Sequence, residues 1–469
     1  MALVVYNTMT RKREEFVPLE EKKVGLYTCG PTIYNFAHIG NFRAYVFEDL
    51  LRRYLEYRGY EVNHVMNLTD VEDKLIRACR ETGEPLGAIT DRYAQSFFED
   101  VDTLGIRRAH VYPAATQHID QMVDLIKTLR DRGHTYEHKG SIYFKLDSFP
   151  EYGKLSHMDL EELRSGASCR VDADEYDPEH AHDFALWKAW DEDDGDVFWA
   201  TELGKGRPGW HIECSAMSMK YLGGSFDIHC GGVDNIFPHH ENEIAQSECA
   251  TGKPFVKYWM HCAHLVVEGK KMSKSLGNFY TLRDLLAKDI DPLAIRWVLV
   301  ATHYRQPNNF SFEAVEAAKQ SLTRIRDFRT RLGEVADAPG VEGASLEETC
   351  AACEKGFVEA MDDDLNISGG LGAMFDFVRH VNRQLDEGAV GEAGARNALA
   401  LLDRLDQVTG ILAPPADEDV PQDVLDRVQA RQEARRAKDF AQADALRDEL
   451  LAAGWFIEDT PEGPRVKRT

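Results

Sequence analysis

The chain has 469 residues, a formal net charge of −25 and nine cysteines. This length allows several domains with cores of their own. The sequence contains no apolar run long enough to cross a bilayer and no charged leader followed by an apolar stretch, so we expect a soluble cytoplasmic protein without a membrane partner. An odd number of irregularly spaced cysteines argues against a disulfide framework and for a reducing compartment. The acidic charge does not resemble that of a nucleic-acid-binding protein, and it requires any polyanionic partner to meet a local basic surface.

A strand–helix–strand unit is predicted near the N-terminus. The first residues are typical of a β-ribbon, which ends in a half-buried strand at 24–29. Apolar residues recur at helical spacing over 42–58, Gly59 suits the end of that helix, and residues 60–68 return as a strand. Such a unit predicts a parallel sheet with nucleotide chemistry at its carboxyl edge.

His38 and Asn41 fall at the start of the predicted helix. Backbone N–H groups and the helix dipole favour a phosphate at that place. A histidine followed by a Gly-Asn turn is also typical of a capping turn. Spacing alone does not decide between a phosphate site and a cap.

The middle of the chain mixes helical, irregular and lysine-rich segments. Residues from about 75 to 131 are mainly helical in pattern, whereas 134–206 are charged, with short strands and an acidic loop, as in an insertion. A later loop contains Lys270, Lys271 and Lys274 between serines, and a helix follows from about residue 282. These lysines suit a mobile loop that grips a polyphosphate, and a solvated lysine turn is the common alternative.

Three residues in this part of the chain suit a metal site: Cys214, His239 and Glu243. Proline is favoured at a first helical position, so a helix that begins at Pro238 would place His239 and Glu243 on one face. A neutral imidazole, a carboxylate and a thiolate from another segment are three parts of a zinc site, and Cys29 is the candidate for the fourth. On pattern alone, residues spaced in this way are more often core and surface residues than ligands.

The C-terminal third is helical in pattern up to about residue 410, and the proline- and acid-rich segment 413–421 predicts a linker. The tail beyond it contains one helical pattern, one short strand and a basic end. Cys350 and Cys353 form a lone pair on a helical pattern with no second pair after it, so we interpret them as structural.

Eight segments that span nearly the whole chain carry recognisable motifs. They are TCGPTIYNFAHIGN (28–41), NLTDVEDK (67–74), DFALWK (183–188), GRPGWHIECSAM (206–217), FDIHCGGVDNIFPHHENEIAQSE (226–248), KKMSKSLGN (270–278), DDDLN (362–366) and KDFAQADALRDELLAAGWFIEDTPEG (438–463). Together, and in this order, they resemble the cysteinyl-tRNA synthetase family of class I aminoacyl-tRNA synthetases.

The resemblance implies an α/β fold: a Rossmann-type parallel-sheet catalytic domain with an insertion, then a helical bundle and a small C-terminal anticodon-binding domain. The implied bounds are 1–118 and 209–244 for the catalytic domain, 119–208 for the insertion, 245–317 for the stem-contact region, 318–412 for the bundle and 413–469 for the anticodon-binding domain.

The resemblance also implies the zinc ligands, which are Cys29, Cys214, His239 and Glu243. Residues 38–41 correspond to the His-Ile-Gly-His element of class I enzymes, with Asn41 in place of the last histidine, and residues 271–275 correspond to the Lys-Met-Ser-Lys-Ser loop. The implied catalytic residues are His38, Asn41, Lys271 and Lys274, the last of which lies most directly on the ATP phosphates.

The remaining implied roles concern the two small substrates. His38, Gly40, Asn41, Gly232, Asp234 and Lys274 would bind ATP or the adenylate, and Thr69, Trp210 and His229 would bind cysteine. The implied reaction is the ATP-dependent ligation of L-cysteine to tRNA(Cys) through cysteinyl-adenylate, with one zinc ion per chain selecting the thiolate and Mg²⁺ accompanying ATP. We expect the protein to act as a monomer.

Two alternative functions share parts of this pattern. The cysteine ligase of mycothiol biosynthesis resembles the catalytic half of the family, but it would not need the region after residue 410. A non-catalytic, zinc-holding tRNA-binding paralogue would be expected to lack His38 or Lys274, and both are present.

The tail is expected to recognise tRNA in spite of the acidity of the chain. Positive charge is concentrated in Arg431, Arg435, Arg436, Lys438 and the end RVKRT, and Trp455 or Phe456 would be able to stack on an unpaired base. The alternative is a solvated helix face paired with Glu433 and Asp439, with the two aromatic residues in a core.

Overall fold

The computed structural model describes residues 2–158, 183–338, 340–412, 422–436, 439–453, 455–460 and 463–468. The chain divides into two compact units, Met1–Ile411 and Leu412–Thr469, and each is described by itself. The predicted linker at 413–421 and Lys438 lie outside the described residues.

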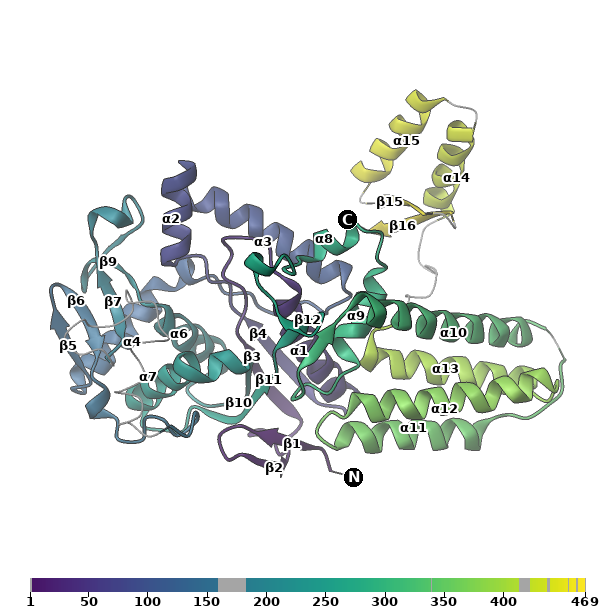
Figure 1. Cartoon of the computed structure of the whole chain (residues 1–469), viewed down its shortest axis with the longest axis horizontal. Helices are drawn as coiled ribbons and strands as arrows, with labels where there is room; N and C mark the ends of the chain where they lie inside the picture. The colour runs from purple at the N-terminus through teal and green to yellow at the C-terminus, as the bar shows by residue number, and fades with distance from the viewer. Residues whose placement is uncertain are drawn as a thin grey trace. The chain divides into compact units, whose positions relative to one another are not determined.

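A four-stranded parallel sheet organises the first unit (Figure 1). Its strands, in spatial order, are β11 (Val256–Cys262), β10 (Phe226–Gly232), β3 (Lys23–Thr28) and β4 (Glu61–Met66). Helix α1 (Ile39–Tyr57) connects β3 to β4, which pair in parallel from Lys23↔Glu61 to Thr28↔Met66. The predicted strand–helix–strand unit is therefore confirmed, although α1 begins three residues earlier than its apolar pattern because His38 caps it.

Helices lie on both faces of this sheet. Helix α1 packs against β4, β10 and β11, and α6 (Trp210–Leu222) packs against β3 and β4. Figure 1 shows α6 and α7 (Glu241–Thr251) on one side of the strands, and α1 and α9 (Pro292–Val300) on the other. A two-stranded ribbon, β1 (Val4–Asn7) with β2 (Lys12–Glu15), precedes the sheet as expected. The helical pattern after β4 becomes α2 (Asp73–Thr82), α3 (Leu86–Thr103) and α4 (Ile119–Asp131).

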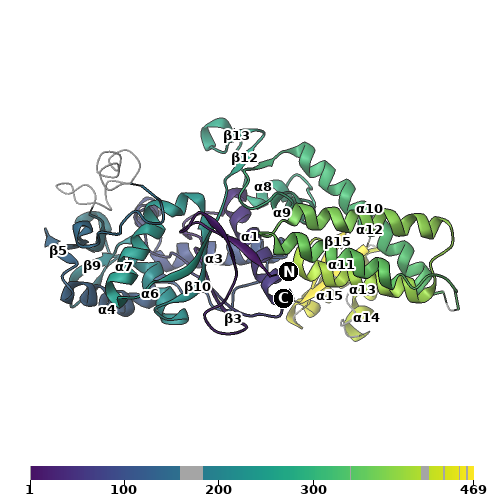
Figure 2. The same cartoon turned by 90° about the horizontal axis from the view of Figure 1, so that it is seen from below.

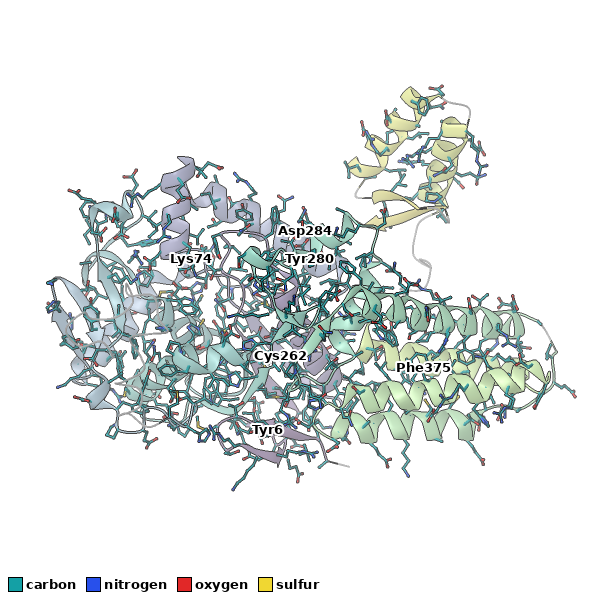
Figure 3. All side chains as sticks on the ribbon, in the orientation of Figure 1. Tyr6, Lys74, Cys262, Tyr280, Asp284 and Phe375 are labelled. Carbon is teal, nitrogen blue, oxygen red and sulfur yellow. The ribbon has the colours of Figure 1, made fainter. Side chains whose placement is uncertain are left out.

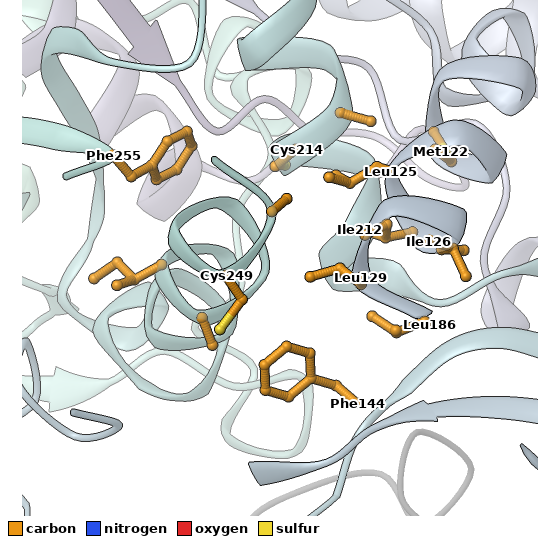
Figure 4. Close-up of a cluster of buried hydrophobic side chains, with 14 of the residues drawn as sticks. Met122, Leu125, Ile126, Leu129, Phe144, Leu186, Ile212, Cys214, Cys249 and Phe255 are labelled. Carbon is orange, nitrogen blue, oxygen red and sulfur yellow. The ribbon is translucent and has the colours of Figure 1, made fainter. Parts of the chain in front are cut away.

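The charged segment between α4 and α6 contains a second, antiparallel sheet. Its strands, in spatial order, are β5 (Thr135–His138), β6 (Ser141–Phe144), β7 (Ala185–Ala189), β9 (Gly204–Pro208) and β8 (Trp199–Thr201). Phe144 and Leu186 of this sheet pack with α4 and with Ile212 of α6 in one buried cluster, which also contains Cys214 (Figure 4). The antiparallel sheet thus shares a hydrophobic core with the parallel one.

The rest of the first unit is a small sheet followed by helices. The small sheet consists of β13 (Lys270–Lys271), β12 (Leu265–Val267) and β14 (Asn308–Phe310), and Figure 2 shows β12 and β13 projecting beyond α8 (Leu282–Leu286). The predicted helices after residue 310 are α10 (Phe312–Ala336), α11 (Glu347–Asp362), α12 (Ile367–Asp386) and α13 (Glu392–Thr409). Cys350 and Cys353 are buried on α11 as free thiols, in agreement with a structural role. Among the described residues, no helix combines the length and apolar character that crossing a bilayer requires.

The second unit corrects the expected tail, which has two helices and two strands rather than one of each. These are α14 (Gln422–Arg436), α15 (Phe440–Ala452), β15 (Trp455–Thr460) and β16 (Gly463–Arg468). The helical pattern is interrupted because Asp439 caps a new helix: its side chain accepts a hydrogen bond from the backbone N–H of Gln442 (3.1 Å). The basic end pairs with β15 as an antiparallel strand.

Candidate active site and metal centre

A cavity of about 580 Å³ opens at the carboxyl edge of the parallel sheet, where nucleotide sites occur in such folds. Its lining includes His38, Gly40, Asn41, Gly232, Asp234, Lys271 and Cys29. Residues from three distant segments of the chain, each expected to bind nucleotide or metal, therefore meet in one cavity. Figure 3 marks Cys262, which also lines the cavity, at the end of β11.

His38 and Asn41 form a reciprocal cap at the start of α1. His38 Nδ1 accepts the backbone N–H of Asn41, and Asn41 Oδ1 accepts the backbone N–H of His38, each at 3.1 Å. Burial lowers the pKa of His38, so the ring is neutral at pH 7, and because Nδ1 is the acceptor, its proton is on Nε2. The capping turn and the cavity lining are thus properties of the same two residues, so the two interpretations of this motif do not exclude one another.

Side chains lie close to two of the glycines that line the cavity, Gly40 and Gly232. A Cβ on Gly40 would come 3.0 Å from the ring of His38 and 3.2 Å from Cε of Met272. A Cβ on Gly232 would collide with Oδ1 of Asp234. Either side chain would therefore disturb a residue that lines the cavity.

The lysine loop is joined to the start of α1 at one end. Lys271 is exposed on β13 and pairs with Val266 of β12, while residues 274–276 form a helical turn. The backbone N–H of Ile39 donates to the carbonyl oxygen of Tyr280 (3.0 Å), so the segment that follows the loop is fixed beside His38. The side chain of Lys274 lies outside the described residues, and its predicted role stays a prediction.

The four predicted metal ligands come together. One ligand atom from each of Cys29, Cys214, His239 and Glu243 lies within 4.8 Å of the other three. Phe237 is extended and helical backbone resumes at Pro238, as the sequence predicts, which places Nε2 of His239 3.2 Å from Oε1 of Glu243.

The chemistry of these four residues fits a zinc ion. Two sulfurs, one imidazole nitrogen and one carboxylate oxygen form a donor set that zinc accepts. Oε1 of Glu243 is buried, and although Nε2 of His239 lies 3.2 Å away, the two do not have hydrogen-bond geometry; a bound cation would satisfy this oxygen. Without a cation, burial raises the pKa of Glu243 to about 8 and lowers that of His239 to about 3. The pKa of Cys29 is also raised, first by its hydrogen bond with Cys214 and second by burial. Metal binding and ligand deprotonation are therefore coupled.

A second, overlapping set of donor atoms was not expected from the sequence. Cys29 and Glu243 also lie within the same limit of His229 and His240. Nε2 of His229 is 3.1 Å from Oε2 of Glu243, and Nε2 of His240 is 3.3 Å from Sγ of Cys29. The sequence contains one sign of this second set, the second histidine at position 240. Adjacent residues of a helix face different directions, and only His239 fits the i, i+4 spacing with Glu243, so His240 was not predicted as a ligand.

Comparison with known proteins identifies the family. Residues 15–320 match the model of the class I (C) tRNA synthetase catalytic domain, residues 356–413 the DALR domain, and residues 417–465 the cysteinyl-tRNA ligase anticodon binding domain. The chain is 49% identical to the cysteine–tRNA ligase of Chlamydia muridarum, over 100% of both chains, and 49% identical to that of Brachyspira hyodysenteriae, over 99% of both. The chain belongs to the cysteine–tRNA ligase family. The resemblance drawn from its motifs is confirmed.

Solved structures confirm the fold of this cysteine–tRNA ligase family member. A methionyl-tRNA synthetase from Mycobacterium tuberculosis in complex with methionyl-adenylate superposes with a TM-score of 0.61 at 17% identity, covering 82% of this chain and 89% of that one. A LeuRS–tRNA–LeuAMS complex from Agrobacterium radiobacter gives a TM-score of 0.60 at 13% identity, covering 84% and 85%. The predicted class I architecture, with its parallel sheet, helical bundle and C-terminal domain, is correct.

Of the three residues expected to bind cysteine in this family member, Trp210 and His229 lie beside the predicted metal ligands, whereas Thr69 has other partners. The ring of Trp210 lies 4.4 Å from that of His239, and His229 contacts Glu243, so both adjoin the proposed ligands. Thr69 is buried, its hydroxyl accepts the side-chain amide of Asn67 (3.1 Å), and its carbonyl accepts the backbone N–H of Ile33. Among the described residues, no hydrogen bond joins Thr69 to the four predicted ligands.

In the C-terminal unit, some of the residues expected to contact tRNA are exposed and others are buried. Arg435 and Arg436 are exposed on α14, whereas Arg431 is buried and is not available to a polyanion. Trp455 packs in a core with Val424 and Ile457, so the alternative of a core residue holds and stacking on a base is wrong for this side chain. The side chain of Phe456 and those of the basic residues after position 464 lie outside the described residues.

Proposed function

We propose that this chain ligates L-cysteine to tRNA(Cys) at the expense of ATP, through cysteinyl-adenylate. The observation that carries the proposal is the position of Cys29. This residue lines the cavity that also contains His38, Asn41 and Lys271, and it belongs to the cluster of thiol, imidazole and carboxylate groups. The proposed nucleotide site and the proposed thiol site therefore share this residue.

The first reaction forms the adenylate. The carboxylate of cysteine attacks the α-phosphorus of ATP, the bond to the bridging oxygen breaks, and pyrophosphate leaves with Mg²⁺. The protein has little covalent chemistry to perform, so positioning and stabilisation of charge provide the rate. The N-terminus of α1, the Nε2–H group of His38, the amide of Asn41, and Lys271 and Lys274 are the groups proposed to contact the phosphates.

The cavity suggests how the nucleoside is held. Gly232 ends β10, and the absence of a side chain there is proposed to allow a base to approach the backbone closely. Asp234 is exposed at the cavity and offers a carboxylate to the ribose hydroxyls. These roles are supported by the cavity lining and by the motif at 226–248.

Selection of cysteine is proposed to depend on the cluster around Cys29, Cys214, His239 and Glu243. When bound there, zinc would act as a borderline-soft Lewis acid, which prefers a thiolate to the hydroxyl of serine. The chain itself orients one ligand: Nδ1 of His239 lies 2.9 Å from Nδ1 of His211, which leaves Nε2 of His239 turned toward Glu243. Trp210 and His229 wall the same region, and Thr69 is proposed to complete it from the β4 side.

The second reaction transfers the cysteinyl group. A hydroxyl of the terminal adenosine of tRNA attacks the carbonyl carbon of the adenylate, and AMP leaves. The C-terminal unit is proposed to hold the anticodon end through exposed arginines such as Arg435 and Arg436.

Two assays performed in sequence test this function. Cysteine-dependent exchange of pyrophosphate into ATP reports the first reaction, and charging of purified tRNA(Cys) reports the second. Exchange without charging, together with ligation of cysteine to an amino-sugar, would favour a mycothiol-type ligase. Absence of exchange in the zinc-loaded chain would favour a non-catalytic paralogue.

A further inference from the structure

Asp73, at the start of α2, receives two cations from the antiparallel sheet. Its Oδ2 accepts a hydrogen bond from Nζ of Lys188 on β7 at 2.8 Å, and its Oδ1 accepts one from the guanidinium of Arg207 on β9. Arg207 is also held from its other side, where its Nε donates to Oδ1 of Asp194 at 2.8 Å. We refer to Asp73, Lys188 and Arg207 as the Asp73 clamp. Lys74, the next residue along α2, marks this region in Figure 3.

The clamp is largely withdrawn from solvent. The side chains of Lys188 and Arg207 are 9% exposed and that of Asp73 is 25% exposed. Burial by itself would raise the pKa of Asp73, but the two cations outweigh it and lower the pKa, so the carboxylate is ionised at neutral pH. Because removal of one partner leaves buried charge uncompensated, such an arrangement tolerates substitution poorly.

Asp73 reduces a like-charge repulsion within the antiparallel sheet. Lys188 and Arg207 are direct register partners across β7 and β9, and like charges opposite one another destabilise a pair of strands. Asp73 bonds to both and so converts a repulsive pair into a bridge between this sheet and α2. The bridge connects segments that lie 115 and 134 residues apart in the chain.

The clamp lies close in sequence to Thr69 and Trp210, two residues proposed to line the cysteine pocket. Asp73 follows Thr69 by four residues, and Arg207 precedes Trp210 by three. The short segment from Arg207 to Trp210 packs tightly against β7. A Cβ on Gly209 would collide with the carbonyl oxygen of Ala185, and the Gly209 N–H donates to the carbonyl oxygen of Leu186 (3.0 Å). The segment is therefore fixed against β7, the strand that also carries Lys188, and it sets the position of Trp210, whose ring faces His239.

We propose that Asp73 is a positioning residue for amino-acid selection, which holds the Thr69 and Trp210 walls of the cysteine pocket at a fixed separation through Lys188 and Arg207. The inference rests on the proposed function. Asp73 is not among the residues that line the cavity or form the donor cluster. Its loss should therefore affect binding of cysteine, the small ligand between the two walls, more than binding of ATP.

The chain contains a matched control. Arg80, on the same helix α2, pairs with Asp193 beside the same antiparallel sheet at 2.7 Å, but these side chains are 55% and 79% exposed. An exposed pair of this kind contributes little to holding two elements in place. Arg80→Ala thus removes an ion pair between the same parts of the molecule without touching the clamp.

The test uses full-length, zinc-loaded protein and cysteine-dependent pyrophosphate exchange. Asp73→Asn keeps the size of the side chain and removes its charge, and we expect it to raise KM for cysteine about tenfold or more, since small misplacements in a site have effects of that size. KM for ATP and the zinc content should stay within about twofold of wild type, and Arg80→Ala should match wild type in all three. Asp73→Glu should recover part of the loss.

Three outcomes would overturn the inference: equal effects of Asp73→Asn and Arg80→Ala, a fall in kcat with unchanged KM for cysteine, or equal rises in both KM values. Should Asp73→Asn fail to fold, as judged by circular dichroism, Lys188→Met provides the same test, because Asp73 then keeps Arg207 as a partner. Lys188→Met should raise KM for cysteine by a smaller factor than Asp73→Asn. An unchanged KM for cysteine in this variant would overturn the inference. Absence of exchange in wild type would instead refute the proposed function.

Discussion

Nδ1 of His211 lies 2.9 Å from Nδ1 of His239, and both rings are buried. Burial lowers the pKa of each to about 3, so both rings are neutral and only one of the two facing nitrogens carries the shared proton. For Nε2 of His239 to accept a metal, its own Nδ1 must be the donor. His211 thus determines which tautomer of His239 is present.

The two overlapping donor sets predict different outcomes for zinc binding. If the set with Cys214 and His239 holds the ion, Cys214→Ser and His239→Asn should each lose most of the zinc, whereas His240→Asn should retain it. Metal analysis of the purified variants measures this directly. Cys230→Ser is the control, because this buried cysteine belongs to neither set. Loss of zinc in His240→Asn with retention in His239→Asn would assign the ion to the second set.

Lys274→Ala is expected to slow adenylate formation by a factor of about 10² or more while leaving cysteine affinity nearly unchanged, because the lysine is proposed to contact charge that develops on the phosphates. Single-turnover formation of the adenylate, together with equilibrium binding of cysteine, separates the two effects. Lys270→Ala, in the same loop, should have the smaller effect. A large increase in the dissociation constant of cysteine at unchanged turnover would contradict this role.

The buried Glu48 on α1 predicts a loss of stability at alkaline pH. Burial raises its pKa to about 8, whereas the nearby Thr28 hydroxyl lowers it to a smaller extent. The folded chain therefore keeps a proton that the unfolded chain has lost above its ordinary pKa of 4.5, so the contribution of Glu48 to stability falls as pH rises from there to about 8, by about 1.4 kcal/mol per pH unit. Glu48→Gln should be more stable than wild type at pH 8.5 and similar to it at pH 4.5.

Urea unfolding at the two pH values checks the prediction for Glu48. The exposed Glu61→Gln serves as the control and should change stability little at either pH. An equal stability difference between Glu48→Gln and wild type at both values would contradict ionisation of this carboxyl group.

Arg296 connects α1 to α13 of the helical bundle, and its loss is expected to destabilise the fold. Its fully buried guanidinium donates to Oδ2 of Asp49 (2.6 Å), to the carbonyl oxygen of Thr409 (3.0 Å) and to that of Leu104 (3.1 Å). Arg296→Met would leave Asp49 without one of its two cations, and we expect a loss of about 3–5 kcal/mol of folding free energy. Removal of the more exposed pair with Arg329→Met should cost at most about 1 kcal/mol, as measured by urea unfolding.

Deletion of residues 412–469, which form the second unit, should leave pyrophosphate exchange largely intact and sharply reduce charging of tRNA. In the full chain, Arg435→Ala combined with Arg436→Ala should weaken tRNA binding and reduce its dependence on salt by roughly one unit of log–log slope per lost phosphate contact. Binding measured over a range of salt concentrations tests this. A truncated chain that charges tRNA as well as the full one would refute the assignment.

Local patterns predicted the parts of this structure that local chemistry determines. The cap at His38, the strands on either side of α1, and the common face of His239 and Glu243 each follow from residues within a few positions of one another. The break before α15 was missed because a single capping residue, Asp439, interrupts an otherwise continuous helical pattern. Residue type alone did not tell that Arg431 is buried while Arg435 is exposed.

Contacts between distant segments were beyond prediction from pattern. The bonds from Asp73 to Lys188 and Arg207 join different motifs, and nothing in the spacing of either motif points to the other. The second donor set has the same origin, because His229 comes from a strand and His240 from the start of a helix. Such relationships depend on how two sheets pack, which the periodicity of a single segment does not contain.

The double membership of Cys29, in the cavity lining and in the donor cluster, has a consequence for inhibitor design. Two compartments that share a wall residue can be occupied by a single rigid molecule. A thiol-bearing group joined to an adenosine through a short, non-hydrolysable linker would lose its freedom of motion once rather than twice, so its affinity should exceed what either fragment achieves alone.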